Sequence, residues 1–202
     1  MSKDSYITQF TPAENGGALI FALHGTGGDE RQFFDLARML CPDAGVVSPR
    51  GDVNENGAAR FFRRTGEGRY DMADFALRTR RLGDYVAAWK ADYPDAPVYG
   101  FGYSNGANIL ASLVMSQPKM FDRVGLLHPL IPWTPADISG LAGTSVLITA
   151  GRSDPICPWY LSAELIDWFA RNGADVSTEI HADGHDIRDG EIAALAGFFR
   201  AG

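Results

Sequence analysis

A Gly-x-Ser-x-Gly pattern at residues 102–106 places the strongest constraint on how this chain can fold. The pattern follows an apolar run at residues 97–101 and precedes a helix-like stretch at residues 107–115. A serine at such a strand-to-helix turn occupies a tight, strained bend, with its hydroxyl above the sheet edge. Gly102 and Gly106 fit there because strand and helix approach too closely to leave room for Cβ atoms. The start of the helix also directs its positive dipole end toward Ser104.

Strand-like and helix-like runs alternate along the whole chain, which favours an α/β fold. Its 202 residues fit a single domain over residues 1–202, with a mostly parallel central sheet and helices on both faces. The predicted strands cover residues 18–23, 45–48, 97–101, 123–127, 144–150 and 174–180, and the predicted helices cover 30–40, 74–89, 107–115, 159–169 and 190–199. Asp29 is expected to cap the first helix. Residues 48–73 read as a long functional loop, and residues 129–135 as a second irregular segment.

Charge and composition narrow the class of protein. The formal net charge is -7, and no long basic run is present, so we expect no nucleic-acid partner. Residues 1–6 lack the apolar stretch of a signal peptide, and no apolar run is long enough for a membrane span. The two cysteines, Cys41 and Cys157, form neither a disulfide framework nor a metal-binding spacing, and are expected to be small buried side chains. We expect a cytoplasmic protein without a membrane partner. The sequence leaves the oligomeric state open, with a homodimer as one of the options.

Two downstream motifs supply what a serine nucleophile needs. A serine hydroxyl requires a base to accept its proton and a third group to orient that base. In this architecture the acid and the base follow the serine in that order, each on a loop after a later strand. Asp154 follows the predicted strand 144–150, and His185 follows the strand 174–180. The sequence therefore predicts a Ser104, Asp154 and His185 triad.

Alternatives exist for each member of this triad. Ser104 could be an ordinary turn residue, and Asp154 could cap the helix at 159–169. Of the four histidines, His24 is expected to brace a loop and His181 to be structural. His128, which begins the Pro-rich segment, could line the cleft and is the rival candidate for the base.

An oxyanion hole needs two backbone N–H groups directed at the carbonyl oxygen of the tetrahedral intermediate. One is expected from Asn105, the residue after the nucleophile. The Gly-rich loop after the early strand supplies the other, and Thr26, directly after His24 and Gly25, is the best candidate.

Four motifs together resemble the phospholipase/carboxylesterase family of α/β-hydrolases, which includes acyl-protein thioesterases and is close to dienelactone hydrolases. The motifs are His-Gly-Thr-Gly-Gly-Asp at 24–29, the pattern at 102–106, Asp-Pro-Ile-Cys-Pro at 154–158 and Gly-His-Asp-Ile at 184–187. Residues 50–64 are more similar to a bacterial branch described as predicted esterases or hydroquinone-stress hydrolases. The resemblance spans nearly the whole chain and implies an α/β-hydrolase fold.

The same resemblance implies that the triad hydrolyses carboxylic esters without a cofactor or a metal. Two departures concern the substrate class. Family members commonly carry Gln after the nucleophile, where this chain has Asn105, and many carry an apolar residue at the position of Thr26. Dienelactone hydrolases typically use cysteine at the bend, so Ser104 argues against that activity.

The segment between Ser104 and Asp154 must hold a helix, two strands and a loop, so no large cap domain fits and we expect an open or shallow cleft. The expected wall residues of this cleft are Phe61, Phe62, Tyr70, Leu130, Ile131, Ile156 and Trp159. Each of these side chains could either contact the substrate or simply pack beneath the loop. Arg63 and Arg64 could bind an anionic substrate group, but ion pairs with Glu55, Glu67 or Asp71 are favoured. The sequence thus predicts a serine hydrolase of small or medium carboxylic esters, or of thioesters. A non-catalytic binding protein and an acyl-transferase or perhydrolase are the alternatives.

Overall fold

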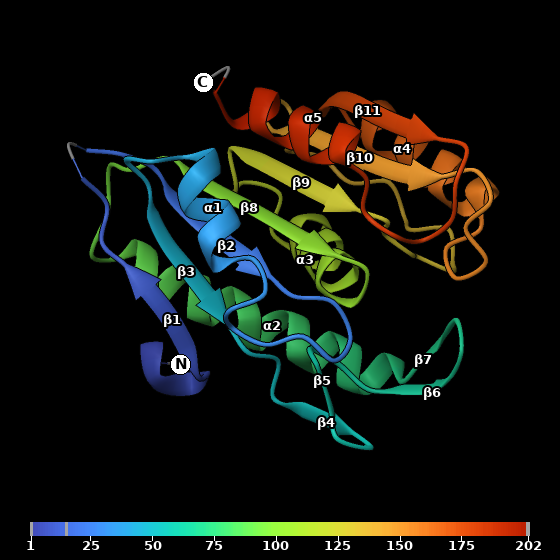
Figure 1. Cartoon of the computed structure of the whole chain (residues 1–202), viewed down its shortest axis with the longest axis horizontal. Coiled ribbons are helices and arrows are strands. Elements are labelled where there is room, and N and C mark those ends of the chain that lie inside the picture. Colours follow the sequence, from blue (N-terminus) through green and yellow to red (C-terminus); the bar gives the residue numbers. More distant parts are fainter. Residues whose placement is uncertain (1, 15, 201–202) are drawn as a thin grey trace.

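A seven-stranded sheet forms the centre of the computed structural model, which describes residues 2–14 and 16–200 (Figure 1). The strand order is β1-β3-β2-β8-β9-β10-β11, and only β1 (Thr8–Thr11) is antiparallel to its neighbour, β3 (Gly45–Pro49). The parallel strands are completed by β2 (Leu19–Leu23), β8 (Val98–Tyr103), β9 (Arg123–Leu127), β10 (Ser145–Gly151) and β11 (Asp175–His181). This arrangement confirms the predicted mostly parallel α/β fold.

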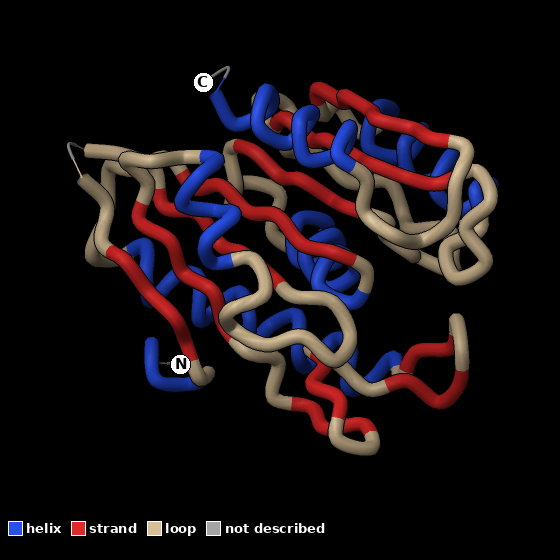
Figure 2. Tube along the Cα trace, in the orientation of Figure 1, coloured by secondary structure: helices blue, strands red, loops and turns tan. Residues whose placement is uncertain are grey.

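Helices cover both faces of this sheet (Figures 1 and 2). Buried side chains of α1 (Phe34–Leu40) and α5 (Asp189–Arg200) belong to the core on one face. Those of α2 (Met72–Lys90), α3 (Asn105–Ser116) and α4 (Trp159–Arg171) belong to the core on the other face. The central strands β2 and β3 are buried along their whole length, as expected for parallel strands covered on both sides.

Predicted element positions hold within a few residues, with three corrections. The helix predicted over 30–40 begins only at Phe34, because Asp29 caps a turn by accepting a hydrogen bond from the amide of Arg31 (2.8 Å). Strand β1 was not predicted, because a four-residue edge strand with one large apolar side chain, Phe10, carries little pattern. A short 3-10 helix, Lys3–Ser5, precedes it.

The third correction concerns residues 48–73, which form two hairpins instead of an irregular loop (Figure 2). The first pairs β4 (Val53–Glu55) with β5 (Ala58–Arg60), and the second pairs β6 (Arg64–Gly66) with β7 (Arg69–Tyr70). The first turn is Asn56-Gly57, with φ of 53° and 90°. Asn-Gly is the dipeptide that such two-residue hairpin turns prefer, since both residues tolerate positive φ. The hairpins lie beside the carboxyl ends of the central strands in Figure 1.

Candidate active site

The bend after β8 has the geometry that its glycines predict. Ser104 adopts φ 50° and ψ -113°, a left-handed backbone that is rare for residues other than glycine. A Cβ on Gly102 would lie 2.6 Å from the carbonyl carbon of Gly106, and a Cβ on Gly106 would lie 2.5 Å from the oxygens of His24 and Leu23. Both glycines are therefore required by close approach of backbone to backbone, and the strain is concentrated at Ser104.

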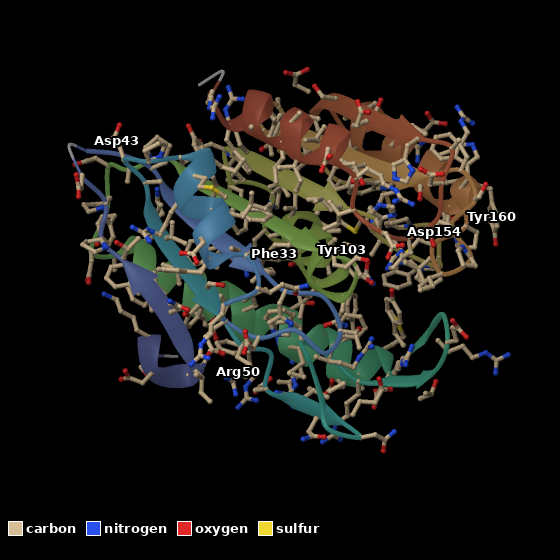
Figure 3. The ribbon with its side chains drawn as sticks, viewed as in Figure 1. Phe33, Asp43, Arg50, Tyr103, Asp154 and Tyr160 are labelled. Atoms are coloured by element: carbon tan, nitrogen blue, oxygen red, sulfur yellow. The ribbon has the colours of Figure 1, made fainter. Side chains whose placement is uncertain are left out.

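The structure brings Ser104, His185 and Asp154 together at the carboxyl edge of the sheet. His185 Nε2 lies 2.9 Å from Ser104 Oγ, and His185 Nδ1 lies 2.7 Å from Asp154 Oδ2. In Figure 3, Asp154 lies beyond the end of β10, at the edge where Tyr103 ends β8. Since Asp154 accepts a hydrogen bond from Nδ1–H, Nε2 is left free to take the proton of the Ser104 hydroxyl.

Asp154 is held as a buried carboxylate. Its Oδ1 accepts hydrogen bonds from the amides of Ile156 (2.8 Å) and Cys157 (2.9 Å). Its Oδ2 contacts the imidazoles of His185 and His128. Burial by itself would raise the pKa of Asp154, but the Cys157 amide and the two imidazoles outweigh it and hold the pKa below its ordinary value. Asp154 does not cap α4, whose N-cap residue is Pro158 and receives no side-chain hydrogen bond, and its carboxylate orients His185 instead.

Tyr103 supports the loop that carries His185. Its hydroxyl donates a hydrogen bond to the His185 carbonyl (2.9 Å), and the two rings lie 5.2 Å apart. Burial raises the pKa of Tyr103 to about 12, so the hydroxyl keeps its proton at neutral pH. The residue directly before Ser104 thus anchors the backbone of the loop that carries His185.

The other three histidines do not reach Ser104. His24 Nδ1 donates to the Gly25 carbonyl (2.6 Å), and His24 Nε2 accepts from the Gly51 amide (2.8 Å), so it braces the loop as expected. His181 faces Glu191 at 3.3 Å. His128, the rival base, has one ring nitrogen on Asp154 and the other on Glu191, and therefore presents neither to the serine.

The candidate oxyanion loop is held by side chains from other segments. The amide of Gly25 donates to Gln32 Oε1 (2.9 Å), and Arg60 Nη1 donates to Thr26 Oγ1 (2.7 Å). Asn105 Oδ1 accepts a hydrogen bond from the Phe61 amide (2.7 Å), which joins the hairpin region to the serine bend. The polar side chains of Thr26 and Asn105, which depart from the common family pattern, thus fix backbone positions next to Ser104.

A pocket of ≈ 380 Å³ lies over Ser104 and His185. It contains Tyr70, Leu130 and Ile156, three of the expected wall residues, together with Thr26 and Asn105. Arg64, considered from the sequence as a contact for an anionic group, also lines it, whereas sequence reasoning missed Arg60, Glu67, Gly68, Tyr103, Asn108 and Cys157. The Gly-Glu-Gly run at residues 66–68 was the available sequence signal for Glu67 and Gly68, because it marks a turn and turns commonly line sites.

Four expected wall residues lie elsewhere. Phe61 and Phe62 are fully buried, and Phe62 packs against the rings of Tyr70 and Phe75. Ile131 borders a separate groove between the Pro-rich segment and α4. The Trp159 ring lies 4.5 Å beneath the guanidinium of Arg152. The structure therefore shows that these four side chains pack against other residues and do not line the pocket over Ser104.

Two arginines of the hairpin region, Arg60 and Arg64, pair with one acidic neighbour. Arg64 Nε contacts Glu55 at 2.8 Å, and Arg60 Nη1 lies 3.4 Å from the same carboxylate. The backbone amide of Arg63 donates to Asp74 (2.8 Å). The ion pair favoured for Arg64 is therefore present, with Glu55 as its partner.

Two clusters within the described residues have spacings that a metal ion could use, namely His128, His181 and Glu191, and His128, Asp154 and His185. In both clusters oppositely charged or hydrogen-bonding atoms already lie 2.7 to 3.3 Å apart, so acid–base contacts account for their geometry. No helix formed by residues 2–14 and 16–200 has the length and apolar character needed to cross a membrane.

Comparison with known proteins decides the family. No family model matches the chain. MhqD of Bacillus subtilis, which is named as a hydrolase, is 38% identical over 175 residues, or 86% of this chain and 88% of MhqD. A solved carboxylesterase from Bacillus cereus is 34% identical, with a TM-score of 0.92 over 98% of this chain and 95% of that one. The chain belongs to the phospholipase/carboxylesterase family of α/β-hydrolases.

As a member of this family, the chain is an esterase-type hydrolase, in agreement with the names of these relatives. A further similar structure is that of a protein of unknown function from Agrobacterium tumefaciens. It is 50% identical, with a TM-score of 0.95, and the match covers 100% of this chain and 98% of that one. The fold described above is thus shared along the whole length of this family member.

Proposed function

We propose that this family member is a serine hydrolase that cleaves small to medium carboxylic esters through an acyl-enzyme. The observation that carries the proposal is the placement of His185 between Ser104 and Asp154, at 2.9 and 2.7 Å, beneath a pocket open to substrate. A hydroxyl, an imidazole and a buried carboxylate at these separations form the arrangement that activates a serine.

Acylation begins when Ser104 Oγ attacks the ester carbonyl carbon and its proton passes to His185 Nε2. The carbonyl oxygen then carries a negative charge in the tetrahedral intermediate. The backbone N–H groups of Asn105 and Thr26 are the proposed donors to that oxygen. When the intermediate collapses, the bond to the leaving alcohol oxygen breaks, and that oxygen takes the proton from His185 Nε2. The acyl group remains on Ser104.

Deacylation repeats these steps with water. His185 Nε2 accepts a proton from water, and the resulting hydroxide oxygen bonds to the acyl carbon. Collapse breaks the bond to Ser104 Oγ, which recovers its proton from His185, and the carboxylic acid leaves. Throughout, Asp154 holds the imidazole in the tautomer with Nδ1–H and stabilises the imidazolium that forms twice per turnover.

The pocket supports the proposed substrate size. A volume of ≈ 380 Å³ is at the small end of small-molecule sites, and no cap domain is formed by residues 2–14 and 16–200. Leu130 and Ile156 offer an apolar wall, whereas Arg60 and Arg64 offer a polar one, and both of these arginines contact the Glu55 carboxylate. We therefore expect short acyl chains to be preferred over long ones, and a small-molecule ester to be the partner.

The test is hydrolysis of 4-nitrophenyl acetate by wild type, Ser104→Ala and Ser116→Ala. The control residue, Ser116, lies exposed at the opposite end of the same helix. We expect Ser104→Ala to lose turnover while keeping the wild-type unfolding temperature, and Ser116→Ala to keep turnover. Unchanged hydrolysis in Ser104→Ala would overturn the proposal.

A substrate panel then separates the alternatives that use the same side chains. Matched esters and thioesters of acetate, butyrate and octanoate measure the acyl preference and the leaving-group preference. Added methanol or hydrogen peroxide competes with water for the acyl-enzyme, so methyl ester or peracid in excess of carboxylic acid would indicate an acyl-transferase or perhydrolase.

A further inference from the structure

His128 occupies a constrained place directly behind Asp154. It follows the last residue of β9 and has a φ of 49°, in the left-handed region. Its side chain is fully buried. Its backbone amide donates to the Thr149 carbonyl (3.0 Å), and its carbonyl accepts from Cys157 Sγ (3.3 Å). A strained backbone that is held on both sides marks a position where the side chain has a task.

Both ring nitrogens of His128 face carboxylates. Nδ1 lies 2.9 Å from Asp154 Oδ2, the same oxygen that contacts His185, and Nε2 lies 3.0 Å from Glu191 Oε1. The second contact is an ion pair at an oblique angle rather than an aligned hydrogen bond. Glu191 is also fully buried, and its other oxygen accepts from the Arg188 amide (2.6 Å).

Charge balance decides the protonation of this pair. A ring nitrogen that faces a carboxylate must carry a proton, and two such nitrogens make an imidazolium. Burial works against that charge, yet the facing carboxylates of Glu191 and Asp154 raise the pKa of His128 above its ordinary value. Burial likewise opposes the charge on Glu191, but His128 lowers the pKa of its carboxyl. Two buried carboxylates without a cation between them would be far less stable.

The remaining groups around His128 are consistent with this charge. The rings of His185, His181 and Tyr103 have centroids at 5.1, 5.4 and 6.0 Å. His181 directs its Nε2 at Glu191 (3.3 Å) and accepts a hydrogen bond from the Asp183 amide at Nδ1. Cys157 stays a thiol because burial raises its pKa. No other acid or base of the described residues contacts the His128 ring.

We propose that His128 is a positioning residue that acts through Asp154, as a permanent buried imidazolium held in place by Glu191. It contacts Asp154 Oδ2 next to His185 and offsets part of the negative charge of that carboxylate. That cation lies 5.1 Å from the His185 ring and opposes the accumulation of a second positive charge there. This inference rests on the proposed serine mechanism.

The first test is the pH dependence of kcat/KM in wild type, His128→Gln and Glu191→Gln. Loss of the cation favours the protonated form of His185, so the acidic limb should move upward in both variants, by roughly one pH unit in His128→Gln. Because the two residues form one unit, the double variant should move the limb no further than His128→Gln alone. His181→Gln is the matched control, since it contacts Glu191 but not Asp154, and its limb should stay in place.

A lower rate with an unmoved acidic limb in His128→Gln would reduce His128 to a packing role and overturn the proposal. Where a variant fails to fold, the wild-type enzyme supplies the answer through ¹⁵N NMR of its imidazoles. We expect both His128 nitrogens to be protonated from pH 6 to pH 8. A single protonated nitrogen at pH 7, or zinc bound stoichiometrically in the purified enzyme, would overturn the proposal. The NMR result does not depend on Ser104. A failure of the serine mechanism can therefore be distinguished from a failure of the proposal for His128.

Discussion

Gly106→Ala tests whether close contact between helix and strand is what places Ser104. The added Cβ would lie 2.5 Å from the carbonyl oxygens of His24 and Leu23, where ordinary contact begins near 3.4 Å. Helix α3 and strand β2 would therefore have to separate by about 1 Å. Overpacking of this kind costs typically ~1–3 kcal/mol, and the obstacle here is backbone, which yields less than a side chain. We expect a loss of about 3 kcal/mol in the free energy of unfolding.

The same displacement should damage catalysis, because His24 begins the loop that holds Thr26. A misplacement of about 1 Å can cost roughly 100-fold in rate. The matched control is Gly197→Ala, an exposed helix position where a Cβ meets nothing within 4 Å. There alanine should stabilise the protein by about 0.5–1 kcal/mol through helix propensity, with activity unchanged.

Urea unfolding followed by tryptophan fluorescence measures the stability of both variants, and hydrolysis of 4-nitrophenyl acetate measures their kcat/KM. If Gly106→Ala unfolds within 1 kcal/mol of wild type and keeps kcat/KM within threefold, the steric account of the bend is wrong.

Three further outcomes follow from the structure. Asp154→Asn should lower kcat by roughly 10⁴-fold in a stopped-flow ester assay, because the imidazole loses its orienting carboxylate, and a loss below tenfold would point to another acid. Iodoacetamide should modify Cys41 slowly, since burial raises the pKa of its thiol to about 11. The buried Cys157 should stay unmodified until urea is added. Fast labelling of Cys157 in the native protein would contradict its buried position. Pairing with Arg50 lowers the pKa of Glu30 below 4.5, so this pair stabilises the fold above pH 4.5, and its contribution disappears as the pH falls further. The stability difference between wild type and Glu30→Gln should shrink in acid-titrated urea melts, and a constant difference would refute the pairing.

Strong periodicity made most of the fold predictable from the sequence. The parallel strands β8, β9 and β10 are largely apolar runs, and the inner stripe of α2, formed by Phe75, Leu82 and Val86, is buried as its spacing predicts. The order of Ser104, Asp154 and His185 was readable because each follows a separate strand, and parallel strands end at one edge of a sheet.

The parts that could not be predicted depend on contacts between distant segments. Phe61 and Phe62 look like a cleft wall in the sequence but are drawn into the core, where the Phe61 amide bonds Asn105. The partnership of His128 with Glu191 joins the end of β9 to the first turn of α5, and no local pattern encodes it. The Asn-Gly hairpin at residues 56–57 is different, because its turn signal was present in the sequence.

Covalent labelling by a fluorophosphonate tests the central claim most directly. The reagent reacts with a serine only where a base activates it and donors stabilise the oxyanion-like adduct. Peptide mass spectrometry of the labelled protein should place a single adduct on Ser104, with the label absent from Ser104→Ala and retained in Ser116→Ala. A folded protein that takes up no label, or takes it up at another residue, would contradict the assignment of Ser104 as the nucleophile.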